Sequence, residues 1–137
     1  MTKNKMIMTL LAVKDVKRSR EFYKETFDFE ISMDLPVGVT FRLHNGHELM
    51  LYQREGFSMN TGCETEDISP GKTTGTELYF HVDEMDDVIE KLEKLRARLL
   101  SPLAPRNWGD DVVYYADPDD NVLAIGRLTS TKEKNTS

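Results

Sequence analysis

The chain of 137 residues has the length of one domain, or of two small modules that share a core. Its formal net charge is −6 at pH 7 and its Lys and Arg residues form no basic stripe, so we expect no nucleic-acid partner. We also expect no membrane contact and a cytoplasmic location, because no apolar run has the length of a membrane span and the start lacks a signal-peptide pattern. Cys63 is the single cysteine, which excludes an intrachain disulfide and leaves a thiol that we take as incidental.

Two segments of the chain resemble each other at an offset of about 69 positions. Residues 8–27 and 77–96 each read as an apolar strand, an acidic residue that can cap a helix, and a helix with apolar side chains at helical spacing. The offset places Leu11 on Phe80 and Val13 on Val82. This repeat predicts a duplicated module within one cooperative unit, with the functional site where the two copies face each other.

The first copy is predicted to contain a strand, a helix capped by Asp15 and three more strands, at residues 6–13, 16–27, 28–33, 39–43 and 48–53. Asn45-Gly46 between the last two strands indicates a two-residue type I′ turn. That turn places Leu43 opposite Glu48, Phe41 opposite Met50 and Val39 opposite Tyr52. His44 and His47 then oppose each other as a solvated pair at the hairpin tip.

Residues 54–75 form a polar stretch with several glycines and no clear periodicity, which predicts a linker or a lid. The second copy follows with a strand at 78–82, a helix capped by Asp83, and strands at 99–103, 112–116 and 122–128. Pro118 fits the second position of a type I turn between the last two strands. The polar residues from Thr129 onward are expected to be frayed.

The order of strand, helix and three strands, used twice, resembles the vicinal-oxygen-chelate superfamily, which includes glyoxalases, extradiol dioxygenases and bleomycin-type resistance proteins. The matching residues are Val13, Asp15, Ser19, Phe22, Tyr23, Val82, Asp83, Asp117, Pro118, Asp119 and Asn121. Asp120 stands where this superfamily usually has Gly, so we expect it to adopt a left-handed conformation at a cost of about 1 kcal/mol.

The resemblance implies an α+β fold of two βαβββ modules, whose curved mixed sheets surround a concave cavity and carry helices on the convex side. It predicts a single glyoxalase-like domain over residues 1–128, with modules at about 6–53 and 76–128, a linker or lid at 54–75, and a tail at 129–137. Side-chain alternation along the strands, together with the loop residue Trp108, gives the candidate ligand-binding set of Met8, Leu10, Phe41, Glu48, Met50, Tyr52, Glu77, Tyr79, Trp108 and Ala124. The same alternation places Ala12, Leu43, His81, Val122 and Gly126 on this face.

Enzymes of the superfamily hold a divalent ion at four strand positions that correspond here to Met8, Met50 (or Glu48 with a shifted register), Glu77 and Ala124. A thioether is a soft ligand and alanine is none, so we expect a site without a metal ion or other cofactor. Glu77 is the candidate catalytic residue, either as a general base or as the counter-ion of a cationic ligand. The alternative is a carboxylate that reaches water or a tyrosine hydroxyl.

Three functional hypotheses follow from these residues. The first is a metal-free small-molecule binding protein of the glyoxalase and bleomycin-resistance type, with an aromatic and Met-rich cavity. The second is a metal-dependent lyase, isomerase or dioxygenase that uses Glu48 and Glu77, and the third is a metal-free catalyst with Glu77 as base and a tyrosine hydroxyl as donor. Trp108 either stacks on a planar ligand as a lid or fills a core or dimer contact. We expect a homodimer.

Overall fold

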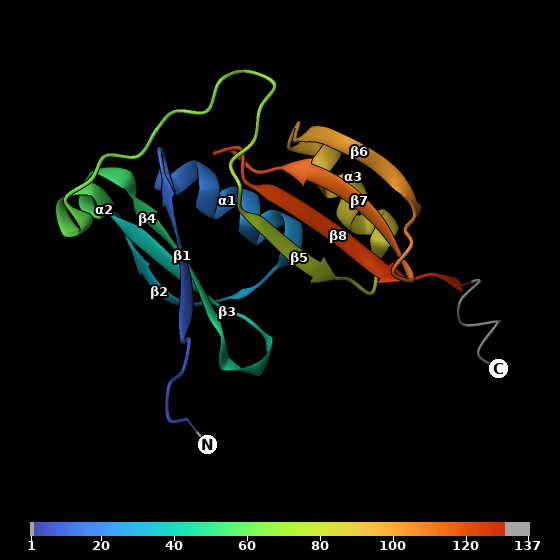
Figure 1. Cartoon of the computed structure of the whole chain (residues 1–137), viewed down its shortest axis with the longest axis horizontal. Helices are drawn as coiled ribbons and strands as arrows, with labels where there is room; N and C mark the ends of the chain where they lie inside the picture. Colours follow the sequence, from blue (N-terminus) through green and yellow to red (C-terminus); the bar gives the residue numbers. More distant parts are fainter. Residues whose placement is uncertain (1, 131–137) are drawn as a thin grey trace. The chain divides into compact units, whose positions relative to one another are not determined.

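The computed structural model describes residues 2–130, which fall into two compact units divided between Asp67 and Ile68. Each unit holds one four-stranded mixed sheet, and the strand orders correspond: β1-β4-β3-β2 in the first unit and β5-β8-β7-β6 in the second. The strands of both sheets are labelled in Figure 1 and coloured by their position in the sequence. The predicted α+β fold of two βαβββ modules is therefore confirmed.

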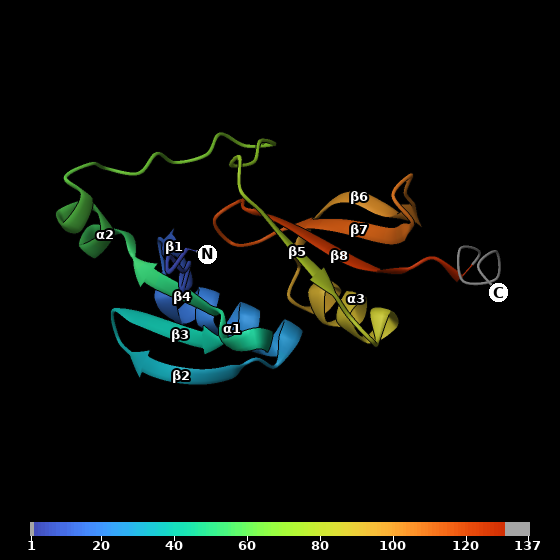
Figure 2. The same cartoon turned by 60° about the horizontal axis from the view of Figure 1, so that its bottom comes forward.

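The first unit begins with β1 (Met8–Val13) and α1 (Val16–Phe27) and continues with three strands, a short 3-10 helix and a second α-helix: β2 (Glu30–Leu35), β3 (Gly38–Arg42), η1 (His44–Gly46), β4 (Glu48–Gln53) and α2 (Arg54–Thr61). The Asp15 carboxylate caps α1 by accepting a hydrogen bond from the Arg18 amide at 3.1 Å, as predicted. Figure 2 shows α1 against one face of this sheet. Its buried side chains, such as Phe22 and Tyr23, form the core there with the sheet.

The predicted register of the β3–β4 hairpin is wrong by one residue. The turn is the 3-10 helix η1 with three residues, in which Gly46 has φ 76°, and the Leu43 amide donates to the His47 carbonyl at 2.8 Å. Arg42 therefore pairs with Glu48, and Phe41 pairs with Leu49. Because side chains alternate, a shift of one residue moves each β3 side chain to the other face of the sheet.

Phe41 shows the consequence of this shift. It is fully buried in the core, where its ring lies 6.3 Å from the Tyr23 ring and 6.1 Å from the Phe29 ring. The prediction that Phe41 faces a ligand cavity is therefore wrong. The predicted opposition of the two histidines is also wrong, because Leu43 rather than His44 is hydrogen-bonded to His47 across the turn. The His47 Nε2 lies 3.0 Å from the Thr9 hydroxyl of β1.

The predicted loop at 54–75 begins with the helix α2. Gly62 ends α2 in a left-handed conformation, with its amide donating to the Ser58 carbonyl at 2.9 Å. The helix has no fully buried residue, so its sequence lacks the apolar stripe that would have predicted it. Gly56 lies against the Tyr52 ring, since a Cβ atom there would be 2.5 Å from the Tyr52 hydroxyl.

The second unit contains one helix and four strands: β5 (Glu77–His81), α3 (Met85–Lys94), β6 (Arg98–Pro105), β7 (Asp110–Ala116) and β8 (Val122–Leu128). Met85, Val88 and Leu92 of α3 are buried, as are Leu123 and Ile125 on the helix side of the sheet. Asp83 was predicted to cap α3, but the residue that precedes the helix is Glu84, which forms no side-chain capping bond.

The β7–β8 turn is held by a buried carboxylate. Asp117 Oδ1 accepts from the Asp119 and Asn121 amides at 2.9 Å each, and Oδ2 accepts from Asn121 Nδ2 at 3.0 Å. The Asp120 amide donates to the Asp117 carbonyl at 3.0 Å, and Asp120 has φ 65°, the predicted left-handed conformation. The Asn121 side chain also accepts from the Thr74 hydroxyl at 2.8 Å.

The remaining sequence predictions concern the membrane and the tail. None of the helices formed by residues 2–130 combines the length and the apolar character needed to cross a membrane. The tail was predicted to be frayed at 129–137, and its residues 131–137 lie outside the described part of the chain.

Candidate functional site

The open face of the second sheet, opposite α3, carries an aromatic and polar row on β5. Glu77, Tyr79 and His81 share this face because side chains alternate along a strand. Tyr79 pairs with Ala124, and His81 pairs with Gly126 on the neighbouring strand β8. A Cβ atom on Gly126 would lie 3.2 Å from the Tyr79 hydroxyl and 3.4 Å from His81 Cδ2, so the absence of a side chain there makes room for both rings.

Four side chains of this face form one hydrogen-bonded chain, which we call the Asp110 cluster: Tyr79, His81, Trp108 and Asp110. Asp110 Oδ2 accepts from the Tyr79 hydroxyl at 2.5 Å and lies 2.7 Å from His81 Nε2. Trp108 Nε1 donates to the Tyr79 hydroxyl oxygen at 2.8 Å. The Asp110 side chain is only 9% exposed, whereas the His81 side chain is 53% exposed. A buried carboxylate thus orients exposed aromatic groups.

The cluster changes the acidity of Tyr79. Burial of the hydroxyl raises the pKa of Tyr79 above the ordinary value of 10.0, and the hydrogen bond to Asp110 adds to this, while the hydrogen bond from Trp108 acts in the opposite direction. The net shift is upward, so Tyr79 is protonated at neutral pH. Its hydroxyl therefore donates to Asp110 while its oxygen accepts from Trp108.

Trp108 is presented by the tight connection between β6 and β7. The Arg106 amide donates to the Asp110 carbonyl at 2.7 Å, and Gly109 has φ 98°, which closes the turn around Trp108. The Arg106 guanidinium donates to the Val112 and Pro102 carbonyls at 2.8 Å each. It also lies 5.1 Å from the centre of the Tyr114 ring, a cation–π distance.

The structure brings together two of the predicted ligand-binding residues, Tyr79 and Trp108. Trp108 is 51% exposed, so the alternative in which it fills the core is wrong. Ala124, also predicted, is fully buried between its strand partners Tyr79 and Tyr114. Glu77 is exposed on the same face, and its proposed catalytic role stays a prediction.

Asp110 was missed by sequence reasoning, and His81 was placed on this face but not among the site residues. The alternation along β7 would have placed Asp110 on the open face had the strand been extended from Val112 back to residue 110. The predicted strand covers only residues 112–116, and aspartate is depleted in strands, so Asp110 carries no local strand signal.

The other predicted site residues lie in the first unit. Met8, Leu10, Glu48, Met50 and Tyr52 occupy the open face of its sheet, opposite the buried row of Leu11, Val13, Leu49 and Leu51. Glu48 pairs directly with Met8, and Met50 pairs with Leu10 two residues further along β1. Its Oε2 accepts a hydrogen bond from the Ser32 hydroxyl at 2.9 Å.

These residues do not fit the divalent ion of the superfamily enzymes. Glu48 lies next to Met8, and Glu77 pairs with Val122, with Ala124 two residues further along β8. Each unit thus supplies one carboxylate beside side chains that are not ligands for a hard cation. In the described part of the chain, no three His, Cys, Asp or Glu side chains are grouped to hold a metal ion.

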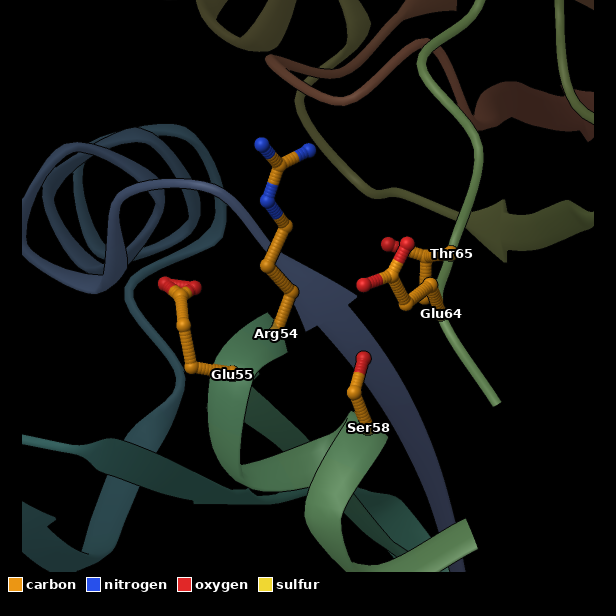
Figure 3. Close-up of a pocket in the computed structure, with 5 residues that line it drawn as sticks. All are labelled: Arg54, Glu55, Ser58, Glu64 and Thr65. Atoms are coloured by element: carbon orange, nitrogen blue, oxygen red, sulfur yellow. The ribbon is translucent and has the colours of Figure 1, made fainter. Parts of the chain in front are cut away.

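A groove of about 520 Å³ lies at α2 in the first unit and is lined by Arg54, Glu55, Ser58, Glu64 and Thr65. Figure 3 shows Glu64 and Thr65 across from Ser58. Arg54 is already bound to Asp67 at 2.6 Å, and Lys14 lies 3.3 Å from the same carboxylate. These two cations lower the pKa of Asp67, the Arg54 hydrogen bond most of all.

Comparison with known families identifies the fold. Residues 6–130 match the family described as the glyoxalase-like domain. The chain belongs to this family. The match agrees with the predicted membership of the vicinal-oxygen-chelate superfamily and covers both units of the glyoxalase-like domain.

Individual relatives of this glyoxalase-like chain are distant. It is 26% identical over 127 residues to the uncharacterized protein YraH of Bacillus subtilis (strain 168), a match that covers 90% of this chain and 98% of that protein. A glyoxalase-related enzyme from Fulvimarina pelagi superposes with a TM-score of 0.77 at 22% identity, covering 89% of this chain and 86% of the other. A glyoxalase/bleomycin resistance protein/dioxygenase from Nocardioides superposes with a TM-score of 0.72 at 20% identity, covering 93% and 85%. At such identities the structural likeness shows the fold alone.

Proposed function

We propose that this glyoxalase-like protein binds a small planar or aromatic molecule on the open face of its second sheet, beside Tyr79 and Trp108, without a resident metal ion. The observation that carries the proposal is the exposure of two aromatic rings that the buried Asp110 holds in place. Trp108 is 51% exposed and Tyr79 is 41% exposed, yet both belong to one hydrogen-bonded chain. Rings that are fixed and exposed lose little conformational freedom when a ligand stacks on them.

The chemistry of the face supports a planar ligand with polar substituents. Tyr79 and Trp108 offer ring surface, and the exposed His81 offers a hydrogen-bonding edge beside it. The Arg106 guanidinium over Tyr114 adds a cation on the same sheet face. The donors support a metal-free site, because the four positions that correspond to the superfamily's metal ligands are Met8, Met50 (or Glu48), Glu77 and Ala124, and neither a thioether nor alanine holds a hard cation. Metal analysis of the purified protein should find no stoichiometric transition metal.

Trp108→Ala tests the proposal. The chain has one tryptophan, so indole fluorescence reports this site alone. The protein is titrated with planar aromatic compounds, and a ligand that binds should quench or shift the emission saturably. Bleomycin is one of these compounds, because one similar structure is described as a glyoxalase/bleomycin resistance protein/dioxygenase. By calorimetry, Trp108→Ala should weaken that ligand about tenfold, or about 1.4 kcal/mol, because the stacking surface is lost.

The matched control is Trp108→Phe, which keeps a ring but loses the N–H that donates to Tyr79. It should retain more of the affinity than Trp108→Ala if stacking dominates. The melting temperature should change little in either variant, because the indole is half exposed. A large loss of stability with unaltered affinity would contradict the proposal.

We also propose that the protein is a homodimer. In the first sheet β1 and β2 are the edge strands, and large apolar side chains are exposed on or beside them: Met6, Ile7, Met33, Leu35 and Val37. Such edges favour burial against another chain. Sedimentation at micromolar concentration should show twice the chain mass, and a single species near 15.8 kDa would contradict the proposal.

A further inference from the structure

We propose that His81, oriented by Asp110, is a general base that removes a proton from a planar carbon acid bound against Tyr79 and Trp108. The inference rests on the proposed binding face and adds a reaction to it. It is independent of Glu77, the base that the sequence suggested.

The direction of each hydrogen bond fixes the tautomer of His81. An indole N–H can only donate, so the Tyr79 oxygen accepts from Trp108 at 2.8 Å. The single hydroxyl hydrogen of Tyr79 then points to Asp110 Oδ2, 2.5 Å away. When Asp110 is ionised its carboxylate can only accept, so the 2.7 Å contact between the same Oδ2 and His81 Nε2 then requires a hydrogen on Nε2. In the neutral ring, Nδ1 is consequently the unprotonated nitrogen.

The unprotonated nitrogen is available to a ligand. The His81 side chain is 53% exposed, and no hydrogen bond to Nδ1 is formed by residues 2–130. The carboxylate that holds the ring is buried. A buried acceptor that fixes the tautomer of an exposed imidazole is the arrangement that general-base catalysis requires, since the base must be oriented without being consumed by a second partner.

The neighbouring rings favour a planar substrate. The Tyr79 and His81 rings lie 6.0 Å apart between centroids, so a planar molecule on Tyr79 and Trp108 brings its edge to the imidazole. In the proposed step the substrate C–H bond breaks and the proton forms a bond with Nδ1. The electron pair stays on the substrate and expels a leaving group from the same ring system. The imidazolium charge then faces the Asp110 carboxylate, which stabilises it.

The test uses 5-nitrobenzisoxazole, a planar carbon acid that needs no co-reactant. A base removes its ring proton, the C–H electron pair completes a nitrile, the N–O bond breaks, and the ring opens to one coloured product, a cyano-nitrophenolate. We expect the purified protein to accelerate this elimination, and His81→Gln to lower the rate about 10²-fold or more, in line with the usual contribution of a general base. His47→Gln is the matched control, because His47 lies in the first unit with its Nε2 at the Thr9 hydroxyl, and it should leave the rate unchanged. A rate that survives His81→Gln, or that falls equally in His47→Gln, overturns the inference.

A second measurement does not depend on turnover. Nitrogen NMR of the imidazoles, with the His81 signals assigned by their loss in His81→Gln, should show the hydrogen on Nε2 in the neutral ring. Asp110→Asn should lower the elimination rate at least about tenfold and lose this tautomer preference, a change that a purely structural role of Asp110 would not produce. A hydrogen on Nδ1 in the wild-type protein overturns the inference whatever the rate.

The two proposals fail in different ways. Saturable quenching of Trp108 by 5-nitrobenzisoxazole without His81-dependent turnover overturns the catalytic inference and leaves the binding function standing. His81-dependent turnover with no response of Trp108 supports the base and contradicts the binding face beside the indole. If the wild-type protein turns over the substrate no faster than His81→Gln, the proposal that His81 is a general base is overturned in either case.

Discussion

The two units share a sheet topology and differ in what the open face of each sheet carries. At equivalent positions of the first strand, the first unit has Met8, Leu10 and Ala12, whereas the second has Glu77, Tyr79 and His81. On the helix side, Leu11 and Val13 of the first unit and Leu78 and Phe80 of the second are apolar. The side chains that face the helix must stay apolar to form the core, so this face of each strand is constrained in both units. The opposite face is free to differ, and in the second unit it holds the Asp110 cluster.

The units make room for a tyrosine on the open face in the same way. In the first unit Gly38 on β3 leaves room for Tyr52, since a Cβ atom there would lie 3.1 Å from the Tyr52 ring. In the second unit Gly126 on β8 leaves room for Tyr79. The glycine lies on the strand next to the tyrosine each time, so the space for the ring comes from a residue far away in the sequence.

The largest expected effect comes from the core. Leu49 in the first unit and Leu123 in the second are equivalent buried residues, and replacing either by Ala should cost about 2–5 kcal/mol of unfolding free energy. Urea denaturation followed by circular dichroism reports both units, and Trp108 fluorescence reports the second. If the domain is one cooperative unit, as its length predicts, both variants shift both transitions by similar amounts. A Trp108 transition that stays unchanged in Leu49→Ala would show that the units unfold separately.

The turns between the last two strands of each unit give the next largest contrast. Asp117→Ala should cost about 1–3 kcal/mol, because the Asn121 amide and side chain lose their buried acceptor. In the first unit His44→Ala lies in the exposed turn η1 and should change stability by less than about 0.5 kcal/mol. Thermal unfolding of both variants measures the difference. Equal effects would mean that the Asp117 hydrogen bonds contribute no net stability.

The smallest expected effect is the pH dependence that Tyr79 adds to the second unit. Its pKa is raised above 10.0 in the folded protein, so folding favours the protonated hydroxyl. The stabilising contribution is therefore complete below pH 10 and is lost as the pH rises through the folded-state pKa. Ultraviolet difference spectra recorded against pH should show tyrosines that ionise with a pKa above 10.0. Tyr79→Phe should remove one of them and leave Tyr115, whose pKa is raised by its own burial. If Tyr79 ionised with the ordinary pKa of 10.0, the result would contradict its burial and its hydrogen bond to Asp110.

The sequence by itself determined the repeated order of elements and the helix-facing core. These depend on local signals: the periodicity of apolar residues in α1 and α3, the Asp15 cap, and the turn around Asp117, whose Asp120 takes the left-handed conformation predicted for it. A local signal can be recognised in a single sequence because the residues that produce it are neighbours along the chain. The superfamily resemblance followed from the order of those elements.

Only the tertiary structure decided the register of the β3–β4 hairpin, the helix α2 and the Asp110 cluster. The sequence predicts a two-residue type I′ turn, whereas the structure has a three-residue turn. Because of this one-residue difference, Phe41 lies in the core and not on the open face. Asp110 joins Tyr79 and His81 although it lies about 30 residues further along the chain, because β7 and β5 both lie beside β8. Strand neighbours and register set which side chains meet, and neither is encoded in the spacing of the residues along the sequence.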